Sequence, residues 1–310
     1  MSIPTPKNNL DFQHIHARIK DVGGIPVARV LPTKQRRLIG AWCFLDHAGP
    51  TVFKGDSAGM RVAPHPHTAL QTFTWMLEGE ILHRDSLGYE QVIRPGQVNL
   101  MTAGKGISHS EDTYGENRHL HAVQLWIALP EAVKDMPPRF DHYPILPKWS
   151  VGDIEYQLLI GEYDSYKAPT LSFSSLLGLD ITTLNNHSLS LTLRPEFEYG
   201  IFVIEGDAII DSQRSHHNEL IYLGQGLSQV SLQLSANSHI LLLGGEPLNE
   251  SVLMWWNFIG RTKAEITAAV AEWNQGSPRF GKVINDERTP TPSPLNAINM
   301  PTKSVKMFIQ

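Results

Sequence analysis

The feature of this 310-residue sequence that most constrains its fold is a succession of short apolar runs separated by Gly, Pro, Asn and Asp. Runs of this kind, bounded by turn-forming residues, are typical of β-strands. We expect strands at residues 70–77, 91–101, 119–129, 188–194, 199–206 and 238–245. The sequence therefore predicts an all-β protein built from many short strands.

One helix is expected near the C-terminus. Thr262 and Glu265 have the spacing of a capping box, in which each side chain satisfies a free backbone N–H at the start of a helix. Apolar residues then follow with helical period at Ile266, Ala269, Val270 and Trp273, and Gly276 is placed to end the helix. We expect this helix to serve packing rather than function.

The sequence also contains an internal repeat. Residues 75–80 (WMLEGE) resemble residues 202–207 (FVIEGD) at an offset of 127, and residues 94–97 (RPGQ) resemble residues 222–225 (YLGQ) with one further residue of slippage. Two matching turns at similar intervals predict a duplicated β-domain. The joint is expected in the proline-bearing stretch 129–150, which is interpreted as linker and loop.

Two pairs of residues able to bind a metal stand at the ends of expected strands: His65 with His67, and His109 with Glu111. Alternate residues of a strand point to the same face, so each pair can direct two ligands into one space. Three imidazoles and one carboxylate suit iron(II), manganese, nickel, copper or zinc. On an octahedral ion they leave about two positions for water, O2 or a substrate.

The remaining histidine pairs are interpreted without a metal. His121, in the pair His119 and His121, is expected to be a core histidine or a support behind the metal ligands. The adjacent residues Asp46 and His47 follow an apolar run and are expected to form a simple turn, although they could reach the mouth of a pocket. Exposed positions are expected for His14, His16, His216 and His217.

The repeat bears on the second half of the chain. The offset, with one further residue of slippage for the second pair, places Thr192, Arg194, Asn237 and His239 at the positions of His65, His67, His109 and Glu111. An arginine there would put a permanent cation where the metal would sit. The second half is therefore expected to bind no metal.

Composition excludes several classes of function. The net charge is −5 and no long basic stretch occurs, so direct nucleic-acid binding is not expected. No secretory signal and no apolar run long enough to span a membrane are found. The single cysteine, Cys43, excludes an intramolecular disulfide, fits a cytoplasmic location and is expected to be a buried, inert thiol.

The sequence resembles the pirins, a family of bicupins in the cupin superfamily. The resemblance is carried by residues 64–88 (PHPHTALQTFTWMLEGEILHRDSLG), 94–111 (RPGQVNLMTAGKGISHSE), 121–129 (HAVQLWIAL) and 244–252 (GGEPLNESV), and extends to about residue 280. It implies two cupin (jelly-roll) β-barrels, face to face, with a short C-terminal helix. The expected divisions are an N-terminal metal-binding domain at 1–135, a C-terminal metal-free domain at 136–280 and a tail of unassigned structure at 281–310.

The resemblance also implies a site. His65, His67, His109 and Glu111 would hold one divalent metal, with iron expected first and nickel, copper, manganese or zinc as alternatives. The glutamate of the general cupin pattern falls at Gln71 here, which removes an acid or base beside the metal but no ligand.

Two functions follow from this resemblance. The first is a dioxygenase that acts with O2 on a quercetin-like flavonol or related enediol, with Glu111 as metal ligand and catalytic base, and with a small aromatic substrate. The alternative is an iron-dependent regulatory protein that binds transcription regulators or metabolic enzymes without turnover. Phe44, Phe73, Trp75 and Trp126 are candidates to line an aromatic cleft, although aromatic residues at alternating strand positions are more often core.

Overall fold

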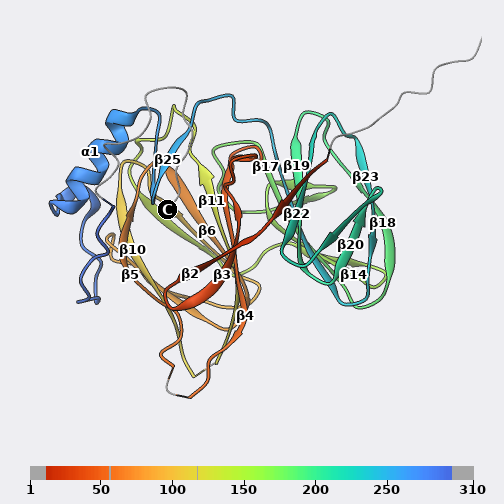
Figure 1. Cartoon of the computed structure of the whole chain (residues 1–310), viewed down its shortest axis with the longest axis horizontal. Coiled ribbons are helices and arrows are strands. Elements are labelled where there is room, and N and C mark those ends of the chain that lie inside the picture. Colours follow the sequence, from red (N-terminus) through yellow and green to blue (C-terminus); the bar gives the residue numbers. More distant parts are fainter. Residues whose placement is uncertain (1–11, 56, 117, 295–310) are drawn as a thin grey trace, which may run out of the picture.

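Two antiparallel β-barrels lie side by side in the computed structural model, which describes residues 12–55, 57–116 and 118–294 (Figure 1). Each barrel combines a seven-stranded sheet with a four-stranded sheet. The alternation of apolar runs and turns that predicted an all-β chain is confirmed, and so is the arrangement as two cupin-like domains with one short C-terminal helix.

The first barrel is formed mainly by the N-terminal half of the chain. Its seven-stranded sheet has the order β12 (Arg139–Tyr143), β9 (Val98–Thr102), β6 (Leu70–Glu78), β11 (His119–Ala128), β4 (Trp42–Val52), β3 (Ile25–Leu31) and β2 (Arg18–Val22). Its four-stranded sheet has the order β5 (Arg61–His67), β10 (Ile107–Thr113), β7 (Ile81–Asp85) and β8 (Glu90–Ile93).

The second barrel repeats this plan strand for strand. Its seven-stranded sheet has the order β1 (Gln13–His16), β22 (Glu219–Gln225), β19 (Glu198–Glu205), β24 (Ser238–Gly245), β17 (Leu176–Thr183), β14 (Ile154–Ile160) and β13 (Lys148–Val151). Its four-stranded sheet has the order β18 (His187–Thr192), β23 (Gln229–Leu234), β20 (Asp207–Ile210) and β21 (Gln213–His216). A two-stranded hairpin, β15 (Glu162–Tyr163) with β16 (Tyr166–Lys167), accompanies this barrel.

The repeated turn motif falls at equivalent places in the two barrels. Residues 75–80 lead from β6 into β7, and residues 202–207 lead from β19 into β20. Gly79 and Gly206 both have positive φ, at 82° and 74°, which glycine adopts without steric cost. The duplication inferred from the sequence therefore reflects a duplicated strand order.

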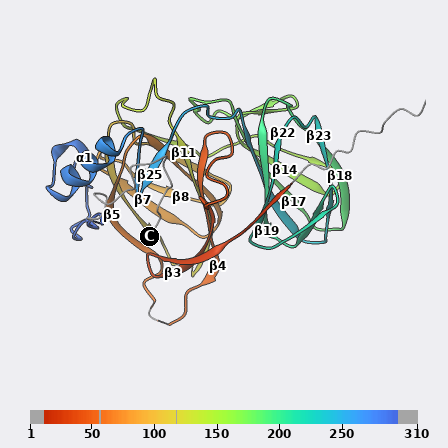
Figure 2. The same ribbon diagram turned by 45° about the horizontal axis from the view of Figure 1, so that its top comes forward.

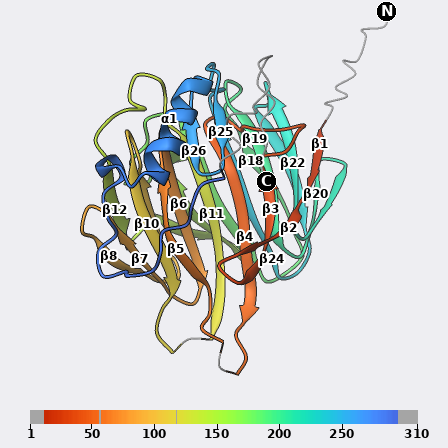
Figure 3. The ribbon, with the colours of Figure 1, turned by 60° about the vertical axis from the view of Figure 1, so that its left-hand side comes forward.

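Each barrel takes an edge strand from outside its own stretch of sequence. The N-terminal strand β1 pairs with β22 of the second barrel, where Figure 3 shows it, and β12 occupies the equivalent place beside β9 in the first. The interpretation of residues 129–150 as linker and loop was wrong in part, because β12 and the start of β13 lie there. The domain boundary at 135/136 stays a prediction.

The two seven-stranded sheets pack face to face and share one apolar core. Trp42, Phe73 and Trp75 from the first barrel meet Phe202 and Leu241 from the second, and all five are at most 2% exposed. The interior of the second barrel holds a separate apolar core. The odd-numbered residues of β6 thus face the other barrel, and its even-numbered residues face the interior of the first.

After the second barrel the chain returns to the first. The hairpin of β25 (Leu253–Trp255) and β26 (Phe258–Gly260), helix α1 (Lys263–Asn274) and a 3-10 turn (Pro278–Phe280) lie against it, as Figure 2 shows. The predicted N-cap is confirmed, because the Thr262 hydroxyl accepts a hydrogen bond from the Glu265 N–H. The tail has no predicted structure, but in its described part the Thr291 N–H donates to the Pro64 carbonyl at 2.8 Å. Residues 295–310 of that tail lie outside the described residues.

Within the described residues, no helix is long and apolar enough to cross a membrane.

Candidate metal centre and its pocket

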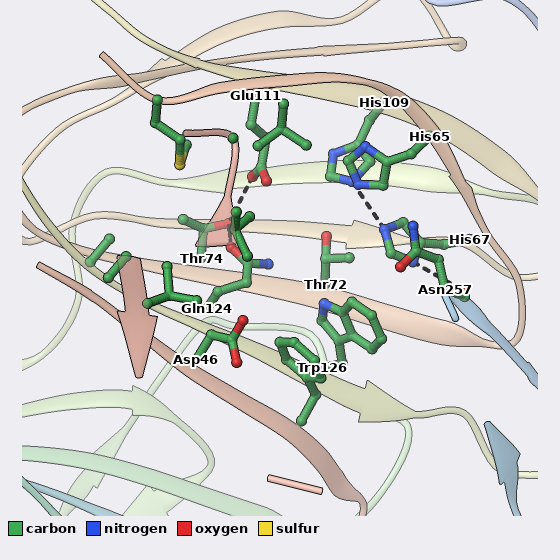
Figure 4. A pocket seen from close by; sticks show the side chains of 18 of the residues that line it. Asp46, His65, His67, Thr72, Thr74, His109, Glu111, Gln124, Trp126 and Asn257 are labelled. Carbon is green, nitrogen blue, oxygen red and sulfur yellow. Dashed lines mark hydrogen bonds between the residues drawn. The ribbon is translucent and has the colours of Figure 1, made fainter. Parts of the chain in front are cut away.

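Three histidines meet on two paired strands of the first barrel. In the β5–β10 ladder, His65 is directly opposite His109, and His67 is opposite Ile107. Since His65 and His67 alternate along β5, their rings point to the same face as the ring of His109. One ligand nitrogen from each ring lies within 4.8 Å of the others, and Figure 4 shows the rings directed into one space.

The hydrogen bonds of these rings determine which nitrogens are free. The Nδ1–H of His65 donates to the Ala63 carbonyl at 2.9 Å, and the Nδ1–H of His67 donates to the Asn257 carbonyl at 3.1 Å. A carbonyl oxygen can only accept, so Nδ1 carries the proton in both rings and Nε2 presents a lone pair. Burial lowers the pKa of His65 to about 4 and the pKa values of His67 and His109 well below their usual range.

Neutral imidazoles with free Nε2 atoms are metal ligands, and the spacing fits an ion. Nε2 of His67 lies 3.1 Å from Nε2 of His109. Adjacent nitrogens bound to one ion at about 2.1 Å are separated by about 3 Å. The donor set and its spacing therefore fit a divalent cation.

Glu111 lies beside this triad but outside it. Its carboxylate is within 4.8 Å of ring nitrogens of His83 and His109, and the Thr74 hydroxyl lies 3.4 Å from Oε1. The β5–β10 register shifts between His109 and Glu111 because β5 carries one extra residue there, whereas β10 pairs with β7 without a shift. Burial raises the pKa of the Glu111 carboxyl, which favours proton uptake at this position.

A pocket of about 470 Å³ opens on the histidines and Glu111. One wall is the stacked pair Phe44 and Trp126, whose ring centroids are 4.0 Å apart at an interplanar angle of 12°. Neighbouring positions of the same sheet give a polar part of the lining, with Thr72, Thr74, Gln124 and Asp46 (Figure 4). Volume and lining are those of a site for a small organic ligand.

The C-terminal segment completes this pocket. Met254, Trp256, Asn257 and Thr291 all line it, although they follow the second barrel in sequence. Thr291 is held in place because its carbonyl accepts a hydrogen bond from the Trp273 indole N–H at 2.8 Å. That this tail reaches the site could not be predicted, since nothing in its local sequence encodes the contact.

The predicted pocket residues divide by the face of the strand they occupy. Phe44 and Trp126 line the pocket, whereas Phe73 and Trp75 belong to the core between the barrels. The expectation of a turn at Asp46 and His47 was wrong, because both are buried in β4, with Asp46 at the pocket.

Gln71 also differs from expectation. It is fully buried, does not line the pocket and donates through Nε2 to the Thr102 hydroxyl. It therefore does not stand where a carboxylate beside the metal would be, and the interior position of this strand is Thr72.

Several other histidine interpretations are confirmed. His121 is a buried core histidine, whereas His16, His216 and His217 are exposed; His14 is only partly buried. Cys43 is a buried free thiol as expected.

In the second barrel the offset of 127 selected the wrong residues. Thr192, Arg194 and Asn237 are exposed, so Arg194 does not enter the barrel. The ladder of β18 with β23 pairs Leu191 with Val230 as β5 with β10 pairs His65 with His109. Both are 1% exposed, so apolar side chains occupy the positions that correspond to those two ligands.

His83 of β7 was not predicted to lie at the site. The Nδ1 atom of His83 lies 3.4 Å from Nδ1 of His109, and His83 is directly opposite Glu111 in the β7–β10 ladder. The only sequence signal was the alternation of His83 and Asp85 on an expected strand.

Two such barrels, with a histidine cluster inside the first, define a bicupin of the cupin superfamily. The Pirin family profile matches residues 24–127, and the profile of the Pirin C-terminal cupin domain matches residues 178–281. The chain belongs to the pirin family.

Relatives and solved structures agree with this assignment. A protein of Pseudomonas aeruginosa with the provisional name quercetin 2,3-dioxygenase is 50% identical over 88% of this chain and 86% of its own length. A crystal structure of a quercetin 2,3-dioxygenase from Acinetobacter baumannii is 41% identical, with a TM-score of 0.89 over 91% of this chain and 95% of that one. The Escherichia coli pirin YhhW, solved in complex with nickel(II), shares the fold at 19% identity, with a TM-score of 0.62 over 76% of this chain and 99% of that one.

Proposed function

We propose that His65, His67 and His109, through Nε2, and Glu111, through its carboxylate, hold one divalent metal, iron first among the candidates. The observation that supports this is the convergence of unprotonated ring nitrogens in a buried site. Nickel, copper, manganese and zinc suit the same ligands, and the supply in the cell decides among them.

We further propose that the chain is a dioxygenase that acts with O2 on a flavonol-like or related enediol substrate. The names of the two similar proteins support this reaction class. When bound, the metal would act as a Lewis acid for a substrate hydroxyl and allow electrons to pass from substrate to O2. Both oxygen atoms of O2 then enter the product, so no other oxidant is required.

The pocket walls have the chemistry that such a substrate needs. Phe44 and Trp126 offer an aromatic face to a planar ring, and Thr72, Thr74 and Gln124 offer hydrogen bonds to its hydroxyl groups. Glu111 would take the proton of the hydroxyl that enters the metal site, since burial raises the pKa of this carboxyl. A cytoplasmic location is proposed on the free thiol of Cys43.

The test is O2 uptake and quercetin absorbance with protein that carries about one metal per chain. We expect both signals to fall with time, and both to be lost in His65→Ala. The variant His16→Gln, which removes an exposed histidine of β1, should behave as the parent. Metal-loaded protein that neither consumes O2 nor alters quercetin absorbance would exclude this substrate class and leave the regulatory alternative.

A further inference from the structure

A buried chain of three side chains leads away from the proposed metal site. Nδ1 of His109 lies 3.4 Å from Nδ1 of His83, and Nε2 of His83 lies 3.1 Å from Oδ2 of Asp85. The three residues are 1%, 2% and 0% exposed. They lie on the paired strands β7 and β10, where Asp85 is directly opposite His109.

Asp85 fixes the proton at the far end of this chain. Its Oδ1 accepts hydrogen bonds from the backbone N–H groups of Leu87 and Tyr89, at 2.9 and 3.1 Å. These bonds hold the Asp85 carboxylate in the turn after β7. A carboxylate can only accept, so Nε2 of His83 carries a proton and donates it to Oδ2.

The contact between the two rings then determines which nitrogen of His109 carries the proton. A His83 ring with its one proton on Nε2 presents a lone pair at Nδ1, and Nδ1 of His83 faces Nδ1 of His109. His109 must supply the proton of this contact, so its tautomer is Nδ1–H and its Nε2 is unprotonated. This is the same tautomer that carbonyl acceptors impose on His65 and His67.

Packing also fixes the orientation of the His83 ring. The ring of His83 stacks on Phe140 of β12, with centroids 4.4 Å apart and an interplanar angle of 15°. Phe140 of the edge strand β12 therefore holds the ring of His83 in place, and His83 contacts the proposed metal ligand His109.

We propose that Asp85 and His83 are positioning residues that hold His109 in the Nδ1–H tautomer, with Nε2 directed at the metal. This inference rests on the proposed metal site. Groups that orient a ligating histidine in this way typically change metal affinity about 10- to 100-fold when removed. Here the acceptor behind His109 is an imidazole, itself oriented by a carboxylate.

The alternative interpretation is that His83 is itself a metal ligand. His83, His109 and Glu111 also form a group within 4.8 Å. In that case His109 would bind through Nδ1, and its Nε2, 3.1 Å from Nε2 of His67, would not be a ligand atom. The two interpretations therefore predict different tautomers of His109, or different metal-bound nitrogens. An experiment can distinguish them.

The direct experiment is a long-range 15N–1H NMR spectrum of the metal-free parent chain, which reports the tautomer of each histidine. We expect His109 as Nδ1–H and His83 as Nε2–H. An Nε2–H tautomer at His109 would overturn the proposal. This measurement needs no variant, so it holds even where a substitution at Asp85 prevents folding.

The second experiment is cobalt(II) titration of Asp85→Asn, followed by calorimetry and visible absorption. An asparagine amide can donate to Nε2 of His83, which reverses both tautomers and places a proton on Nε2 of His109. We expect cobalt(II) binding weaker by about 10- to 100-fold, with the absorption bands of the bound ion retained. The matched control is Asp180→Asn, since Asp180 is also buried and accepts from a histidine, His239, at 2.6 Å.

The outcomes separate this proposal from the metal site itself. If cobalt(II) binding to the parent is not weakened by His65→Ala, the metal site is wrong. If His65→Ala abolishes binding and Asp85→Asn matches Asp180→Asn, only the positioning role is wrong. If His83→Gln changes the absorption bands of the cobalt(II) that it still binds, His83 is a ligand and the positioning role is overturned.

Discussion

His47, buried between the two barrels, makes the stability of the chain depend on pH. It lies on β4, is 1% exposed, and places Nδ1 2.7 Å from Oδ1 of Asn218 in the second barrel. Its Nε2 lies 2.7 Å from Nε2 of His121, and the ring of His217 is 5.7 Å away. Burial, with smaller contributions from His217 and His239, lowers the pKa of His47 from 6.5 to about 4.

The sign and size of the effect follow from this shift. The unfolded chain takes up a proton at His47 as the pH falls through about 6.5, whereas the folded chain resists protonation until about pH 4. The unfolded state therefore binds more protons between these values, and stability falls as the pH falls. The difference amounts to about 3 kcal/mol at pH 4, since one pKa unit corresponds to about 1.4 kcal/mol.

The assay is urea unfolding of metal-free protein at pH 7 and pH 4, with the parent and His47→Gln. We expect the parent to lose about 3 kcal/mol more of its free energy of unfolding than His47→Gln over this interval. The metal-site histidines are present in both proteins, so their contributions cancel in the difference. His16→Gln controls for the loss of a histidine that lies on the surface.

Equal losses of stability in the parent and His47→Gln would refute this reasoning. They would mean that His47 is protonated to the same extent in the folded and the unfolded chain. Its environment in solution would then differ from the buried contact with Asn218.

Three further results are expected. Trp126→Ala removes one side of the aromatic stack at the pocket, so quercetin should bind about 10-fold more weakly in equilibrium titrations, with little change in metal content. Gly79→Ala places a Cβ 2.0 Å from the His119 carbonyl oxygen at a φ of +82°, so urea unfolding should show a loss of more than about 1 kcal/mol. Metal at about 100 times its dissociation constant should add about 2.7 kcal/mol to the free energy of unfolding of the parent and nothing to that of His65→Ala.

Much of the fold was predictable because it depends on local patterns. Turn residues between apolar runs located β6, β11, β19 and β24, and the repeated Glu-Gly-acid turn identified the duplication. The capping box at Thr262 located α1 for the same reason, since the cap and the Glu265 N–H that donates to it are only three residues apart.

It was harder to predict which face of its strand each residue occupies. A shift of one residue moves every side chain of a strand to the opposite face. For this reason Gln71 was assigned beside the metal when Thr72 faces the pocket, and Arg194 was assigned to the second barrel interior when Leu193 is buried there. A constant offset also fails because loops of the two barrels differ in length.

Contacts distant in sequence, other than that of the two metal-binding pairs, could not be predicted. Asn257 supports His67 from 190 residues away, and Thr291 reaches the pocket from the tail. His83 lacked a partner in the sequence because its role depends on the pairing of β7 with β10. Such contacts are set by the packing of whole elements rather than by any local motif.

The most direct test of the proposed metal centre is a crystal structure of the chain purified without added metal, with anomalous data at the absorption edge of the element that elemental analysis detects. We predict one anomalous peak per chain, about 2 Å from Nε2 of His65, His67 and His109, with the Glu111 carboxylate completing the set. A peak bound instead to Nδ1 of His83 and His109 would contradict the account. A chain that carries one metal per molecule but shows no anomalous peak at the three histidines would also contradict the account.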